Sequence, residues 1–264
     1  MHGHHEVIRQ YLHETALKIF KLKASVLGWD CKPNEPSTDA VKRAVVLGMC
    51  VTAEDPTTLL ECQKKFNSID VETFNKNGIP NIAPELLGIV CIACIRHDKT
   101  DKSWKKIMKL HNVATLAADK RTFQNALGCT KDINLMKQTL DWSINSGMVR
   151  NQNMFVPVGS IGRTDSKRKI NEPSIIWEWF TSSYIQLKEK KLSNSIFNDI
   201  LSSSLIGFVR NSDDQIIAKI WLDQQNVSND MLKTFEKCME KVDIIINRRL
   251  REETVLLNII GNVD

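Results

Sequence analysis

The sequence predicts an all-α fold of the HEAT- or armadillo-like α-solenoid type, built from antiparallel helix pairs. Apolar residues recur at intervals of three and four along most of the chain, which is the spacing of one helix face. Sustained period-two alternation is missing, and Asn77-Gly78 is the only Asn-Gly pair that could close a β-hairpin. The predicted helices are short, with short connections, so each pair would bury its apolar face against the next pair. The repeat is weak at any fixed period, which favours a HEAT-like array over a consensus repeat.

The first half of the chain carries clear signals for where helices begin and end. Asp55 followed by Pro56 is an N-cap with proline at the first helical position. Gly28, Gly128 and Gly147 each follow an apolar helical stretch and are expected to end it. Segment 31–36 contains two prolines and is expected to be a loop. The expected helices cover residues 7–20, 39–50, 57–66, 86–95, a stretch after Asp101, 117–127 and 132–144.

The pattern loosens between residues 148 and 171, where Pro157, Gly159 and Gly162 accompany a basic stretch. We interpret residues 1–264 as a single helical-repeat domain with a loose internal boundary at about 148–172. Helical spacing then returns, and predicts helices over residues 173–190, 193–208, 213–225, 229–247 and 250–260.

The charge of the chain is only mildly basic. It has 36 Lys and Arg against 31 Asp and Glu, a formal net charge of +5. The densest basic stretch runs from Arg163 to Lys169 and is typical of a solvated loop. Such a stretch leaves a nucleic-acid-binding solenoid as one alternative. Because the charge is mild and not gathered on one helix face, however, we expect no nucleic-acid partner.

The cysteines and the N-terminus bear on the compartment. The seven cysteines include Cys91 and Cys94, a CxxC inside an apolar helical run that indicates core residues. Residues 1–7 lack an apolar signal region, and the longest apolar run is about ten residues, half of a membrane span. These features favour the cytoplasm, although Asn226-Val227-Ser228 is a glycosylation sequon, and a longer enzyme could be lumenal or membrane-attached.

No complete catalytic or metal site is visible in the sequence. A zinc-peptidase HExxH helix needs a second histidine four residues after the first. Arg9 stands there after His5-Glu6, and Leu17 stands there after His13-Glu14. A structural role explains the remaining candidate residues better than metal binding or catalysis does. A fraying N-terminus accounts for His2, His4 and His5, helix ends account for His97 and His111, and a turn between helices accounts for Cys129. We therefore predict no catalytic residue, no metal site and no cofactor in this chain.

A set of weak motifs in a fixed order resembles a known family. Gly28-Trp29-Asp30, Glu35 and the segment 42–47 are similar to the opening of the C-terminal domain of zinc metallo-aminopeptidases, which include the endoplasmic-reticulum, leucyl-cystinyl, puromycin-sensitive and aminopeptidase N enzymes. The resemblance covers essentially the whole chain and continues through segments 62–66, 79–86, Trp104, 120–132, 149–153, 161–163 and 176–179. Asn153 stands in place of Asp, Tyr184 in place of Trp, and the insert 164–171 is basic and longer than usual.

The resemblance implies a concave helical bowl that encloses the peptide-substrate chamber. The zinc ion and the bond-breaking residues would lie in a separate catalytic domain, whose exopeptidase loop and HExxH helix are missing here. Among the motif positions, Arg150, Gln152 and Arg163 are the candidates for peptide binding, since cationic side chains can hold a carboxylate. Hydrogen bonding between helices would explain these three residues as well. The chain would be a fragment, a split gene product or, as the alternative, a stand-alone helical-repeat module that binds protein or peptide and has lost the enzyme.

Trp177 and Trp179 lie two apart, so one can pack in the core while the other faces a second surface.

Overall fold

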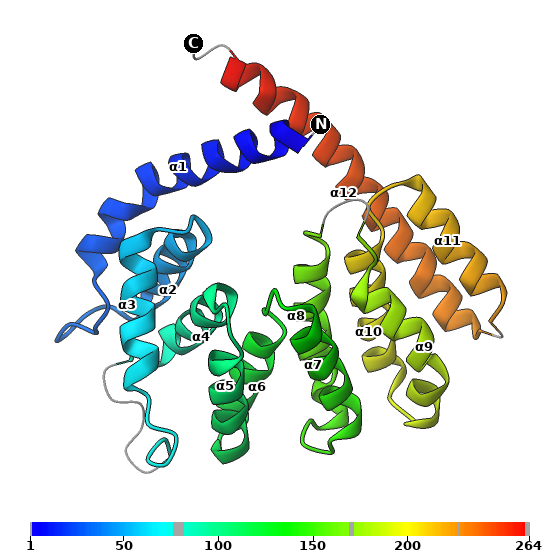
Figure 1. Ribbon diagram of the computed structural model, residues 1–264, viewed down its shortest axis with the longest axis horizontal. Coiled ribbons are helices and arrows are strands. Elements are labelled where there is room, and N and C mark those ends of the chain that lie inside the picture. The colour runs from blue at the N-terminus through cyan, green and yellow to red at the C-terminus, as the bar shows by residue number, and fades with distance from the viewer. Residues whose placement is uncertain (1, 76–81, 169–171, 226, 262–264) are drawn as a thin grey trace. The chain divides into compact units, whose positions relative to one another are not determined.

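The computed structural model describes residues 2–75, 82–168, 172–225 and 227–261, and throughout these ranges the regular structure is helical (Figure 1). The all-α prediction is therefore confirmed. The chain divides into two compact units: a first unit of Met1–Phe123 with Leu250–Asp264, and a second unit of Gln124–Arg249. This division falls inside helix α6 (Ala117–Leu127), whereas the segment 148–172 lies within the second unit. The prediction of one domain with a boundary at that segment stays a prediction.

In the first unit, helices that follow one another in sequence pack together. Helix α1 packs on α2, α3 on α4, and α4 also contacts α2 and α5. The elements are α1 (His2–Leu27), α2 (Ser37–Thr52), α3 (Pro56–Ser68), the 3₁₀ turn η1 (Pro84–Leu86), α4 (Leu87–His97) and α5 (Lys102–Val113), followed by the start of α6.

The predicted cap of α3 is present and is tied to a second helix. The Asp55 carboxylate accepts the backbone N–H of Thr58 at 2.9 Å, and Pro56 occupies the first helical position. The Lys21 ammonium of α1 donates to the same carboxylate at 2.9 Å. The Asp55 side chain thus accepts a hydrogen bond from a backbone N–H in the first turn of α3 and also links this helix to α1.

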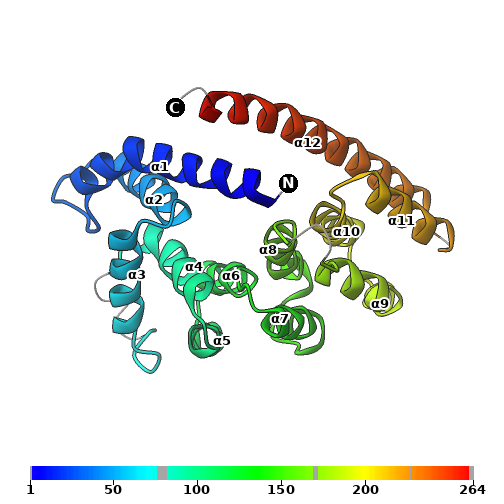
Figure 2. The same cartoon turned by 45° about the horizontal axis from the view of Figure 1, so that its top comes forward.

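The second unit is organised around the crossing of two helices, α8 and α10 (Figures 1 and 2). At Gly162 of α8, a Cβ would lie 2.5 Å from the Ser203 carbonyl oxygen, and at Gly207 of α10 it would lie 2.9 Å from Gly162 Cα. Both glycines are needed because the backbones approach too closely for a side chain. After the end of α6, the elements are α7 (Ile133–Asn145), η2 (Asn151–Asn153), α8 (Phe155–Asp165), α9 (Ile175–Glu189), α10 (Asn194–Phe208), α11 (Ser212–Asp223) and α12 (Asn229–Gly261). The part of α12 from Leu250 onward is assigned to the first unit.

Two sequence expectations were wrong. The stretch 148–171 was expected to be irregular, but it contains helix α8. Pro157 lies in the first turn of α8, where a missing N–H costs little, and Gly162 serves the crossing with α10. The expected helices 229–247 and 250–260 form one continuous α12, since no glycine or proline separates them. None of the described helices is long and apolar enough to span a membrane.

An aromatic cluster forms much of the core between α9, α10 and α11. Trp177 stacks on Phe208 with ring centroids 4.8 Å apart and meets Trp221 edge-on at 5.3 Å. Phe180 and Tyr184 continue the cluster along α9. Trp177 is buried while Trp179 is half-buried, as the two-residue spacing predicts.

Candidate functional site

The three predicted peptide-binding residues lie at the two ends of helix α8, in the second unit. Arg150 and Gln152 belong to the turn that enters α8, and both are exposed. Val149 and Met154, on either side of them, are buried and anchor this turn. Arg163 lies in the last turn of α8. At 1.5 Å per residue, it is about 12 Å along the helix axis from Phe155, where α8 begins. The structure therefore places Arg150 and Gln152 together at the start of α8 and Arg163 at the other end of this helix.

Arg163 takes part in hydrogen bonds between two helices. Its guanidinium donates to the Asn125 amide oxygen at 3.0 Å and to the Ser160 hydroxyl at 3.0 Å. The Ser160 hydroxyl itself donates to the same amide oxygen at 2.6 Å. These contacts join α8 to α6 and fix the direction of a guanidinium that remains exposed. By contrast, Arg150 and Gln152 form no hydrogen bond or ion pair with the part of the chain that the structure describes.

In the basic stretch, Arg168 also forms structural contacts. The Arg168 guanidinium donates to the carbonyl oxygens of Gly207 at 2.7 Å and Phe208 at 2.9 Å, so it caps the end of α10. Burial lowers the pKa of Arg168. The Asp165 carboxylate is buried and accepts from the Ser174 hydroxyl at 2.6 Å, at the start of α9. Lys167 is exposed, and Lys169 lies outside the described residues.

In the first unit, residues of the opening motif form a buried ion cluster. The Arg43 guanidinium is fully buried and donates to Glu35 at 2.5 Å and to Glu85 at 2.9 Å. The hydrogen bond from Arg43 is the main reason that the pKa of Glu35 falls to about 2. Close by in sequence, Asp30 pairs with Lys65 at 3.2 Å, and the Lys65 ammonium lies 5.8 Å from the centre of the Trp29 ring. These motif residues therefore hold helices together.

The cysteines of the CxxC and most of the others lie in the core, whereas Cys31 is exposed. Cys91 is fully buried, and the thiol of half-buried Cys94 donates to the Cys62 carbonyl at 3.6 Å. Burial raises the pKa of Cys62 and of Cys94 to about 12, so both stay protonated at neutral pH. Cys129 is also buried. Among the described residues, no group of three or more His, Cys, Asp or Glu side chains could hold a metal ion.

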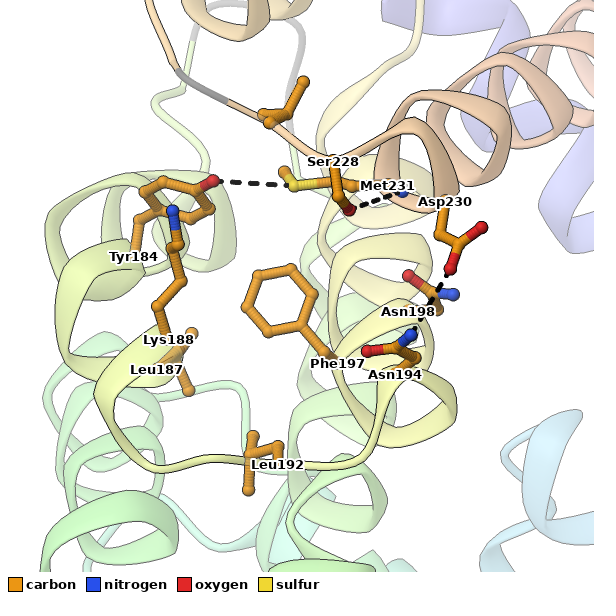
Figure 3. Close-up of a pocket in the computed structure, with 11 residues that line it drawn as sticks. Tyr184, Leu187, Lys188, Leu192, Asn194, Phe197, Asn198, Ser228, Asp230 and Met231 are labelled. Atoms are coloured by element: carbon orange, nitrogen blue, oxygen red, sulfur yellow. Dashed lines mark hydrogen bonds between the residues drawn. The ribbon is translucent and has the colours of Figure 1, made fainter.

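A pocket of about 390 Å³ opens between α9, α10 and the start of α12 (Figure 3). Tyr184 and Lys188 lie on one side of it and the Phe197 ring stands in the middle, while Asn194, Asn198 and Asp230 line the opposite side. The Asn194 amide donates to the Asp230 carboxylate at 3.3 Å. The Tyr184 hydroxyl contacts the Met231 sulfur at 3.6 Å. Leu187, Leu192, Val227 and Met231 supply apolar surface.

Sequence reasoning missed this pocket, although part of the signal was present. Tyr184 and Lys188 are four residues apart on one helix, and so are Asn194 and Asn198 on the next. Their meeting with Met231, 47 residues after Tyr184, depends on how the helices pack. The sequon residue Asn226 lies outside the described residues.

Comparison with known proteins identifies the same family that the ordered motifs resemble. A family model described as "ERAP1-like C-terminal domain" matches residues 2–243. Aminopeptidase M1 of Arabidopsis thaliana is 20% identical over 231 residues, which cover 87% of this chain and 25% of that protein. Aminopeptidase M1-A of Oryza sativa subsp. japonica is 23% identical over 249 residues, which cover 91% of this chain and 26% of that protein. The chain thus spans about a quarter of the length of these curated relatives. A match over nearly the whole chain, together with the all-helical fold, shows that this protein belongs to the family of ERAP1-like C-terminal domains of aminopeptidases.

Proposed function

We propose that this chain acts as the non-catalytic C-terminal domain of a zinc metallo-aminopeptidase. In this role it encloses the chamber that holds the peptide substrate, and it supports the removal of N-terminal amino acids by a separate catalytic domain. The observation that carries the proposal is the family match over residues 2–243. The relatives that extend beyond this region bear the name aminopeptidase.

The residues present in this chain do not fit a catalytic zinc ion. In both candidate segments the second histidine of HExxH is replaced, by Arg9 in one and by Leu17 in the other. The described part of the chain offers no group of three metal-binding side chains. The proposed contribution of the chain is therefore binding and closure, which exclude water and large proteins from a reaction carried out elsewhere.

Arg150 and Gln152 are our candidates for direct contact with the peptide. Both project from a turn anchored by buried neighbours, and neither has a partner among the described residues. A guanidinium can bind a carboxylate through two parallel hydrogen bonds, so Arg150 suits the free C-terminus or an acidic side chain of a peptide. Arg163 can add a second cation, in a direction that Asn125 and Ser160 fix.

Reporter hydrolysis by the purified full chain tests the assignment of the chemistry to another domain. We expect no release of dye from an aminoacyl reporter, with or without added Zn²⁺. Robust zinc-dependent turnover that co-purifies with the chain would contradict the proposal.

Peptide binding tests the second half of the proposal. Fluorescence anisotropy should show weaker binding of labelled peptides when their C-terminal carboxylate is amidated. Arg150→Gln should weaken binding about two- to fivefold, as expected for an exposed charge pair. Lys137→Gln is the matched control, because Lys137 is an exposed cation on α7 and its replacement removes the same charge. Peptide binding by a chain that never associates with a catalytic domain would instead support the stand-alone binding module.

A further inference from the structure

The pocket between α9, α10 and α12 has the features of a small-molecule site. Its volume of about 390 Å³ falls within the range of roughly 300–1,000 Å³ that such sites occupy. Leu187 and Met231 are buried and Phe197 is half-buried, so the floor is apolar. Polar side chains make up a large share of the remaining lining and can fix the orientation of a ligand.

One buried polar group in the pocket has only a weak partner. Tyr184 is 5% exposed, and its hydroxyl donates only to the thioether sulfur of Met231, 3.6 Å away, among the described residues. A thioether is a poor acceptor, so the hydroxyl would gain from a carboxylate or carbonyl oxygen. Figure 3 shows this hydroxyl at the edge of the space that the pocket residues surround.

A cation lies over the ring that carries this hydroxyl. Lys188 follows Tyr184 by one helical turn, and its ammonium lies 5.3 Å from the centre of the Tyr184 ring. Within the part of the chain that the structure describes, no carboxylate pairs with Lys188. Asp230, on the opposite side of the pocket, is already hydrogen-bonded to Asn194. A hydroxyl and an ammonium on the same side of a pocket match a carboxylate.

The second polar side of the pocket adds an amide. Asn198 lies one turn after Asn194 on α10, and its side chain has no hydrogen-bond partner among the described residues. A primary amide offers both donors and an acceptor, so Asn198 can accommodate a polar substituent on the ligand.

We propose that this pocket binds a small organic acid with an apolar, aryl or branched body. The carboxylate would accept hydrogen bonds from Tyr184 and Lys188, and the body would lie against Phe197, Leu187 and Met231. This site is separate in sequence from the turn that carries Arg150 and Gln152, and the inference does not depend on the proposed function.

Titration calorimetry and ligand-observed NMR on the full chain test this assignment, with phenylacetate as the probe and phenylacetamide as its neutral counterpart. We expect phenylacetate to bind and phenylacetamide to bind at least about tenfold more weakly. Lys188→Gln and Tyr184→Phe should each weaken phenylacetate binding several-fold. Lys219→Gln, which removes an exposed cation from α11 outside the pocket, should leave it unchanged. Leu192→Trp should abolish binding by filling the space.

Four results would each overturn the proposal. The first is absence of phenylacetate binding to the folded wild-type chain, and the second is equal binding of the acid and the amide. The third is binding that survives Leu192→Trp. The fourth is preference for a longer chain: if an N-acetylated peptide ending in phenylalanine binds at the same residues at least about tenfold more tightly than phenylacetate, the site recognises peptides rather than small acids.

Discussion

The Arg43 guanidinium and the Glu35 carboxylate form an ion pair at 2.5 Å, with Arg43 fully buried and Glu35 almost so. Glu85, from the turn before α4, shares the same guanidinium at 2.9 Å. A buried cation between two carboxylates stabilises a fold only while all the partners are present, because each charge left alone has lost its water. The cluster therefore explains why three separated motif residues occur together in this family member.

Replacing Arg43 should be strongly destabilising. Arg43→Met leaves two carboxylates facing each other in a partly buried site, and we expect the free energy of unfolding to fall by at least about 2 kcal/mol. Urea unfolding followed by circular dichroism measures this change. Lys42→Gln, at an exposed neighbour that pairs with Asp39, should change it by less than about 0.5 kcal/mol. Equal effects of the two substitutions would contradict a structural role for the cluster.

The same cluster predicts how stability depends on pH. The pKa of Glu35 is lowered to about 2 in the folded chain from an ordinary value of 4.5. A lowered carboxyl pKa contributes stability that is fully present above the unfolded value and is lost as pH falls through the folded value. Urea midpoints measured between pH 6 and pH 2 should therefore decline in the wild type below about pH 4.5. Glu35→Gln should start lower and decline less, and an unchanged slope in that variant would count against this assignment.

The α8–α10 crossing should not accept a single added methyl group. In Gly162→Ala the new Cβ would lie 2.5 Å from a backbone oxygen, so the helices must move apart. Overpacking of this kind costs about 1–3 kcal/mol, which thermal or urea unfolding would detect. Gly48→Ala is the control, because its nearest new neighbour is the Ile89 Cδ1 atom at 3.7 Å. This control should be neutral or slightly stabilising, since alanine favours helix over glycine.

Thiol labelling should separate one cysteine from the others. Cys31 is exposed, whereas burial raises the pKa of Cys62 and Cys94 to about 12. In native buffer, iodoacetamide should modify Cys31 first, as mass spectrometry of peptides can show. A hydrogen bond to Glu35 raises the pKa of Cys31, so Glu35→Gln should accelerate its labelling. Rapid native labelling of Cys62 or Cys94 would show that the α3–α4 core is open in solution.

The helices could be predicted wherever local signals and tertiary packing agree. Asp55-Pro56 caps α3, and Gly147 has the positive φ of 71° that ends a helix. Gly128 follows α6 as expected, but for a different reason: its Cβ would lie 2.5 Å from the Pro157 carbonyl oxygen. Helix α8 was missed because Pro157 and Gly162 indicate a loop when the crossing with α10 is unknown. The roles of Arg163 and Tyr184 likewise depend on partners distant in sequence, namely Asn125 and Met231.

The most direct test follows binding and cleavage of one peptide in the same sample of purified chain. Anisotropy reports binding of a labelled peptide with a free C-terminus, and mass spectrometry reports whether its N-terminal residue is removed. For a non-catalytic, peptide-enclosing domain we expect binding that weakens in Arg150→Gln, while the peptide stays intact with or without Zn²⁺. Zinc-dependent loss of the N-terminal residue, or no binding of any peptide by the folded chain, would contradict this account.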